Sequence, residues 1–169
     1  MELDQQRFRS EYLLESASKT LQVGTLLAWI SLPVITGFAL QDVFLLDLND
    51  VWIWRVIGIV PFVLFLGYRY LFSNREPLWV IRLHMLNLSG IVTMMAGIAY
   101  VVLADPEATL LNQYGVSAGL ITTLFISLIV AGPARKALFW ILPIILVGMT
   151  IALLTTIGFD STRLGFLSN

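Results

Sequence analysis

Hydrophobic positions along the chain gather into five long runs that short polar stretches separate. The runs cover residues 21–40, 51–70, 78–103, 112–130 and 138–158. Each is long enough to cross about 30 Å of hydrocarbon as a helix, since a transmembrane helix needs about 20 mostly apolar residues. The pattern therefore predicts an all-α integral membrane protein, with one bundle domain of five transmembrane helices over residues 21–169.

Residues 1–20 differ from these runs, because charged and apolar residues are mixed in them. Phe8, Tyr12 and Leu13 fall on one helical face by their spacing. Arg7, Arg9 and Lys19 would lie near anionic lipid headgroups. We interpret this segment as an amphipathic helix in the cytoplasmic interface of the membrane. The alternative is a solvated helix that contacts a partner.

The composition supports a membrane protein and excludes several other classes. Hydrophobic residues make up 58% of the chain and charged residues 12%, with a mean hydropathy of +0.86. An average soluble domain has roughly 25% charged residues. A net charge of -1 without a basic stripe argues against a nucleic-acid partner. The absence of cysteine excludes disulfides and thiolate sites.

The placement of basic residues predicts the orientation of the chain. Short loops rich in Lys and Arg stay on the cytoplasmic side of a membrane. With five spans and a cytoplasmic N-terminus, eight of the ten basic residues fall inside and two outside. The inner set is Arg7, Arg9, Lys19, Arg69, Arg75, Arg82, Arg135 and Lys136, and the outer set is Arg55 and Arg163.

Arg55 is a charged residue in the outer half of the second apolar run, about one turn below its outer boundary. An arginine at that depth either extends to the interface or pairs with an acid. The candidate partners at the outer face are Asp47, Asp50, Asp105 and Glu107. A snorkelling arginine is the simpler interpretation, and a role in ligand binding or gating is the alternative.

Small residues recur every four positions in three of the runs. Helices in lipid associate through such residues because they let backbones approach closely. We therefore expect these faces to point into the bundle. The three stripes are Ser89-Thr93-Gly97, Gly119-Thr123-Ser127 and Gly148-Ala152-Thr156.

The chemistry that the residues allow is limited. Haem between helices usually needs histidines, and His84 is the only one. Both lysines lie at the interface, every Asp and Glu lies outside the apolar runs, and no nucleophile and base pair is evident. We therefore expect no cofactor, no metal and no catalysis in this region.

One cluster of polar residues lies at the inner end of the third run. His84 and Asn87 are three residues apart and share a helical face, with Arg82 beside them and Arg69 across the turn. These four residues are a candidate site for a lipid headgroup, a quinone or another small ligand, or for a protonation-dependent contact. Interfacial hydrogen bonding and phospholipid contact are the alternative.

The pattern resembles the N-terminal membrane-integral (MASE-like) sensor regions of bacterial nucleotide cyclases, diguanylate cyclases and some histidine kinases. The similar features are the amphipathic segment from Arg7 to Lys19, the acidic stretch from Asp42 to Asp50, Trp54-Arg55 followed by Pro61, and Gln113-Tyr114. The resemblance implies a multi-pass protein of the bacterial inner membrane. It also implies a sixth span and a cytoplasmic output domain in the parent protein. Residues 164–169 are interpreted either as the first turns of a sixth helix or as an extracytoplasmic tail that docks on a neighbour.

Two hypotheses for the function follow. The first is a non-catalytic, homodimeric input module that senses a cue at the membrane or outer face and passes a helix displacement to a cytoplasmic enzyme. The second is an accessory subunit that binds lipid and the helices of other subunits in a larger membrane complex. A small-solute carrier is a third, which the lack of buried charge and of an inverted repeat disfavours.

Overall fold

A computed structural model describes residues 2–44, 51–72, 76–105 and 110–157. These residues form five α-helices and one 3-10 helix, and the described part of the chain contains no strand. The helices are α1 (Glu2–Phe44), α2 (Trp52–Leu71), α3 (Pro77–Ala104), α4 (Leu110–Val130) and α5 (Arg135–Ile157), with η1 (Gly132–Ala134) between the last two. The all-helical prediction is confirmed.

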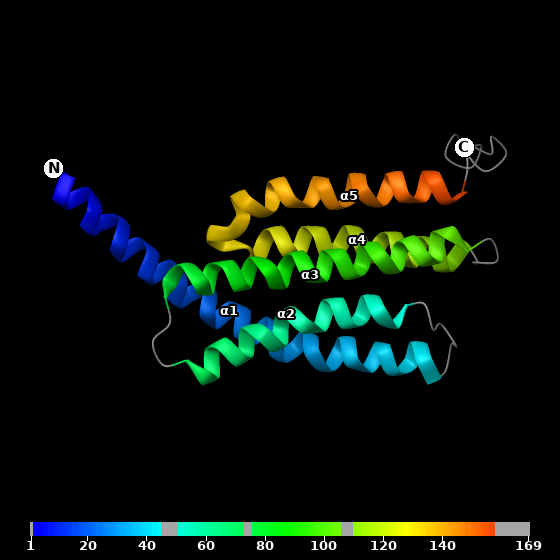
Figure 1. Ribbon diagram of the computed structural model, residues 1–169, viewed down its shortest axis with the longest axis horizontal. Coiled ribbons are helices and arrows are strands. Elements are labelled where there is room, and N and C mark those ends of the chain that lie inside the picture. Colours follow the sequence, from blue (N-terminus) through cyan, green and yellow to red (C-terminus); the bar gives the residue numbers. More distant parts are fainter. Residues whose placement is uncertain (1, 45–50, 73–75, 106–109, 158–169) are drawn as a thin grey trace.

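The α1 helix is longer than the first apolar run. It continues without a break from residue 2 through Pro33 to Phe44, so the predicted interfacial segment and the first apolar run form one helix. No helix-breaking residue separates residue 20 from residue 21, and Gln41 to Phe44 extend the helix by one more turn. The first part of α1 projects past the end of the bundle (Figure 1).

The two ends of the bundle can be told apart by their turns (Figure 1). We call the end from which α1 projects the proximal end; it holds the α2–α3 connection and the α4–α5 turn. The opposite, distal end holds Phe44, Trp52 and the end of α3. At the proximal end, Pro77 begins α3, and the Glu76 backbone N–H donates to the Tyr68 hydroxyl at 3.0 Å.

The α3 helix is the centre of the bundle and contacts all four other α-helices. In Figure 1, α1 and α2 lie on one side of it and α5 on the other. One core cluster joins α1, α2 and α3 around Ala28, Phe62 and Met94. A second joins α3 to the α4–α5 turn and α5 around Leu88, Ala131 and Leu138.

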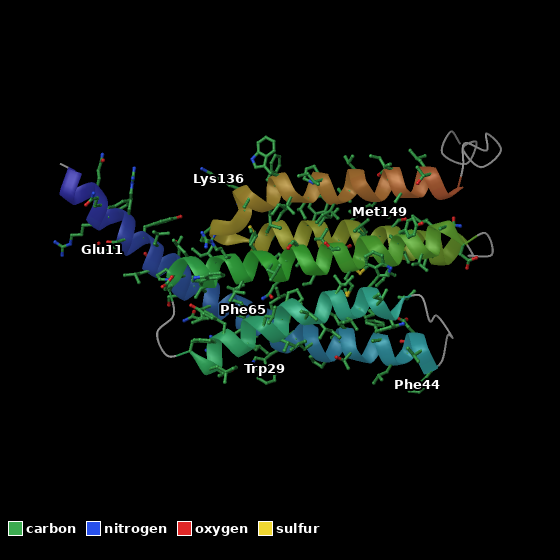
Figure 2. All side chains as sticks on the ribbon, in the orientation of Figure 1. Glu11, Trp29, Phe44, Phe65, Lys136 and Met149 are labelled. Carbon is green, nitrogen blue, oxygen red and sulfur yellow. The ribbon has the colours of Figure 1, made fainter. Side chains whose placement is uncertain are left out.

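Large apolar side chains cover the outside of the bundle in addition to filling its core. Trp29 and Phe44 project from the outer side of α1, whereas Phe65 lies between α2 and α3 (Figure 2). The exposed set continues over α2, α4 and α5 and includes Ile53, Val60, Leu64, Phe125, Ile129, Trp140, Ile144 and Val147. Such a surface suits lipid, because a soluble protein rarely exposes a large contiguous apolar patch.

Four of the described helices, α1, α2, α3 and α5, are long and apolar enough to cross a membrane. The α4 helix contains a shorter apolar stretch, Gly115–Val130. The predicted five spans and the orientation of the chain therefore remain predictions. Residues 164–169, where a sixth span is expected to begin, lie outside the described residues.

Candidate functional site

His84 lies inside the bundle, in the proximal half of α3, with 1% of its surface exposed. Its Nε2 atom is 3.1 Å from the Val130 carbonyl oxygen at the end of α4. A carbonyl oxygen only accepts, so Nε2 must carry the proton and Nδ1 is left as an acceptor in the neutral ring. His84 therefore ties the α4–α5 turn to α3.

The opposite side of the His84 ring faces α1 and α2. The Phe65 ring lies with its centroid 6.3 Å from the His84 centroid. A Cβ atom added to Gly24 would be 2.5 Å from the Phe65 ring and 3.1 Å from His84 Nδ1. Only glycine fits here without movement of its neighbours, so the α1 backbone closes the site directly.

Asn87 follows His84 by three residues and is fully buried. Its Nδ2 and Oδ1 atoms, like His84 Nδ1, have no hydrogen-bond partner among the described residues. A buried polar atom without a partner costs about 1–3 kcal/mol. The pair therefore offers one donor group, the Asn87 NH2, and two acceptor atoms in the interior, which a water or another small polar molecule could satisfy.

The two arginines of the predicted group are placed elsewhere. Arg69 on α2 donates to Thr25 Oγ1 at 2.7 Å and to the Leu21 carbonyl at 3.3 Å, so it holds α2 to α1. Arg82 is exposed and lies over the Trp79 ring, 5.5 Å from its centroid. The structure thus keeps His84 and Asn87 together, whereas Arg82 faces outward and Arg69 serves a different contact.

At the distal end, Arg55 forms an ion pair with Asp42, which is not one of its four predicted partners. Its Nε donates to Asp42 Oδ2 at 2.9 Å, and the two side chains are only 12% and 7% exposed. The Phe38 ring lies beneath the guanidinium at 5.3 Å. Asp105 lies exposed at the end of α3, and Asp47, Asp50 and Glu107 lie outside the described residues.

The sequence contains a pattern that places Asp42 on the buried face of α1. Ala28, Ile35 and Asp42 are seven residues apart, and all three are buried on one side of α1. Residues at that spacing share a helical face. If the helix is extended by one turn beyond residue 40, Asp42 faces α2. If a loop begins at residue 41, the direction of the Asp42 side chain is undefined.

The small-residue stripes have different surroundings. Gly97 lies directly under the Trp54 ring, Ser127 is buried, and Gly119 faces Met95. The hydroxyls of Ser89 and Thr123 donate to carbonyls of their own helices, those of Leu86 and Gly119. Gly148 is exposed, with no atom within 4 Å of an added Cβ. Thr156 lies outside the described side chains.

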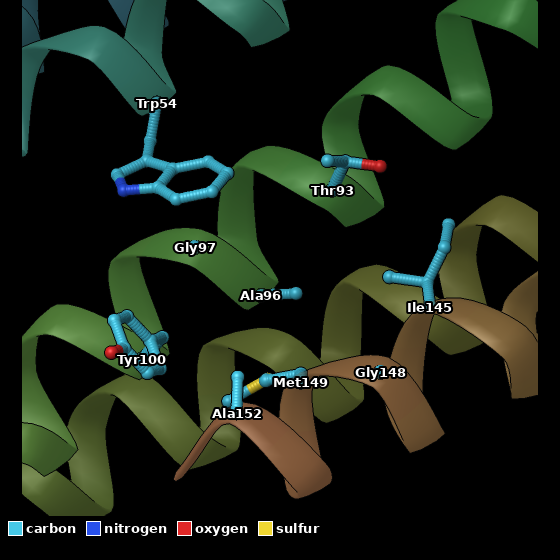
Figure 3. A pocket seen from close by; sticks show the side chains of 9 residues that line it. All are labelled: Trp54, Thr93, Ala96, Gly97, Tyr100, Ile145, Gly148, Met149 and Ala152. Atoms are coloured by element: carbon cyan, nitrogen blue, oxygen red, sulfur yellow. The ribbon is translucent and has the colours of Figure 1, made fainter. Parts of the chain in front are cut away.

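The exposed part of these stripes borders an apolar groove of about 280 Å³ between α3 and α5. Figure 3 shows Trp54 lying over the α3 backbone at Gly97, with Gly148 and Ala152 on the facing helix. Thr93 also lines the groove. Its walls carry no charged side chain, so the groove offers shape and apolar contact rather than chemistry.

No group of three or more His, Cys, Asp or Glu side chains that could hold a metal ion occurs among the described residues. Comparisons of the chain with protein-family models, with curated proteins and with solved structures give no match.

Proposed function

We propose that this chain is a five-span membrane bundle of the bacterial inner membrane, with its N-terminus in the cytoplasm, that acts as a non-catalytic input module. It would regulate a cytoplasmic signalling output such as a nucleotide or diguanylate cyclase. The apolar outer surface and the inward bias of basic residues support the membrane placement. The resemblance to sensor regions supports the role.

The unbroken α1 helix is the observation that carries this proposal. At its distal end Asp42 pairs with Arg55, and Thr25 and the Leu21 carbonyl bind Arg69 further along. Both arginines belong to α2, so α1 is held to α2 at two levels. A helix rises about 1.5 Å per residue, so a displacement at Asp42 would be carried about 45 Å to Tyr12.

The His84–Asn87 pair is the candidate site for the cue or for a lipid that modulates the response. It lies between the two halves of the bundle, because His84 contacts α2 through Phe65 and the α4–α5 turn through Val130. A polar molecule that satisfied Nδ1 and the Asn87 amide would favour one packing of α1 against α3.

The second candidate is an accessory subunit of a larger membrane complex. The specific observation that favours it is the exposed apolar face on the projecting part of α1, where Phe8 is 71% and Tyr12 57% exposed. The exposed apolar side of α5 would supply a further contact with partner helices.

Native mass spectrometry of the assembly, extracted gently from its own membrane, separates the two candidates. A homodimer of one polypeptide supports the input module. A stoichiometric complex with different polypeptides supports the accessory subunit and contradicts the homodimeric module.

A further inference from the structure

A pocket of about 320 Å³ with a mixed polar and apolar lining lies at the proximal end, between α1 and the α4–α5 turn. The α1 helix contributes Glu15, Ser16, Lys19 and Thr20 to its lining, and Val130 and Gly132 line the facing side. It is separate from the His84–Asn87 pair, although His84 holds its far wall through the hydrogen bond to the Val130 carbonyl.

The floor of this pocket carries two hydroxyl groups without partners. Ser16 is 9% exposed and Thr20 5% exposed, and neither hydroxyl forms a hydrogen bond within the described part of the chain. The neighbouring Thr25 hydroxyl donates to the Leu21 carbonyl of its own helix at 2.6 Å. Ser16 and Thr20 therefore keep donors available to a molecule in the pocket.

The rim of the pocket carries one charge of each sign. Lys19 Nζ lies 2.7 Å from Glu15 Oε1, and both side chains are largely exposed. The hydrogen bond and the charge of Lys19 lower the pKa of the Glu15 carboxyl, so both groups are ionised at neutral pH. The lining thus has no net charge but offers one positive and one negative group, which matches a zwitterion better than an anion.

The structure assigns this pocket to a zwitterionic headgroup that joins a phosphate to a primary ammonium, as in phosphatidylethanolamine. The phosphate oxygens accept from Lys19 and from the hydroxyls of Ser16 and Thr20. The ammonium donates to the Glu15 carboxylate. A lipid as the source rests on the proposed placement of the proximal end at the inner membrane face; free phosphoethanolamine has the same chemistry.

The test is native mass spectrometry of the full chain in detergent, with one lipid added at a time. Phosphatidylethanolamine is expected to be retained more tightly than phosphatidylglycerol, whose headgroup has no ammonium, and than phosphatidylcholine, whose quaternary ammonium cannot donate. Lys19→Gln and Glu15→Gln should each weaken the retention of phosphatidylethanolamine about tenfold. The loss of one hydrogen bond to a charged group lowers an affinity by about that factor.

The matched control is Arg7→Gln. Arg7 Nε and Glu11 Oε1 form an exposed ion pair of the same spacing on the same helix, at 3.2 Å, and neither residue lines the pocket. This variant should retain the lipid like the parent chain. Binding of soluble phosphoethanolamine with the same dependence on Lys19 and Glu15 supports the same site with a soluble occupant.

Three results would overturn the assignment: equal retention of phosphatidylglycerol, unchanged retention in both pocket variants, or equal weakening by Arg7→Gln. Each of these can be told apart from a failure of the proposed function, because the oligomeric state of the assembly does not enter the measurement.

Discussion

At the scale of single residues, the described polar side chains of the interior differ in how they are satisfied. Arg55 and Asp42 pair with each other, and Arg69 bonds to a hydroxyl and a carbonyl of α1. His84 is half satisfied, and the Asn87 amide has no partner among the described residues. The paired groups join helices, whereas the unpaired atoms are the ones that remain available to a ligand.

Removing one member of the distal ion pair should be costly. Arg55→Gln or Asp42→Asn alone would leave an uncompensated charge in a mostly buried position, a loss of up to about 3–5 kcal/mol. The double variant should lose less than the two single losses added together, because no charge is then left alone. Thermal unfolding in detergent measures each change, and additive losses would show that the pair is not coupled.

At the scale of the helices, α1 depends on close approach at one glycine. Gly24 brings the α1 backbone against Phe65 and His84, and this contact seats the helix on α2 and α3. Gly37 lies on the same helix, further toward the distal end, with no atom within 4 Å of an added Cβ. The two positions therefore separate the effect of packing from the effect of helix propensity.

Gly24→Ala should destabilise the bundle by about 1–3 kcal/mol, the usual cost of overpacking a filled interior. Gly37→Ala should be neutral or should stabilise it by up to about 1 kcal/mol, because alanine is the better helix former. Unfolding of both variants in the same detergent provides the comparison. Equal effects at the two positions would mean that α1 does not pack closely on α3.

At the scale of the whole molecule, large apolar residues lie both in the core and on the outside of the bundle. Small and polar residues such as Gly97, Asn87 and Ser127 are buried around α3 together with Phe62 and Leu88. In lipid this is favourable, since apolar side chains gain little by leaving an equally apolar solvent, whereas small residues allow helices to pack.

Single cysteines test the proposed orientation without background labelling, because the natural chain has none. Glu76 at the proximal end and Asp105 at the distal end are both exposed and lie just outside α3. In intact cells a membrane-impermeant maleimide should label Asp105→Cys and spare Glu76→Cys until the cells are opened. The reverse pattern would invert the topology, and labelling of neither in opened cells would show that the sites are covered.

Much of the fold could be predicted because helix formation in an apolar run is a local property. The predicted runs 51–70, 78–103 and 112–130 match α2, α3 and α4 to within a few residues. The α5 helix begins at Arg135 rather than at residue 138, and α1 extends to Phe44 rather than ending at residue 40. Polar residues at those positions suggested loops, yet they also fit the ends of helices.

The sequence by itself determined the helices, their apolar character and the candidate pair His84 and Asn87, because these follow from spacing along one helix. Only the tertiary structure decided that Asp42 rather than a loop acid pairs with Arg55, that Arg69 binds α1, and that Ser16 and Thr20 face the α4–α5 turn. These contacts join different helices or turns. Which side chains meet depends on how the helices rotate and cross. The hydrophobic period of a single helix does not determine this.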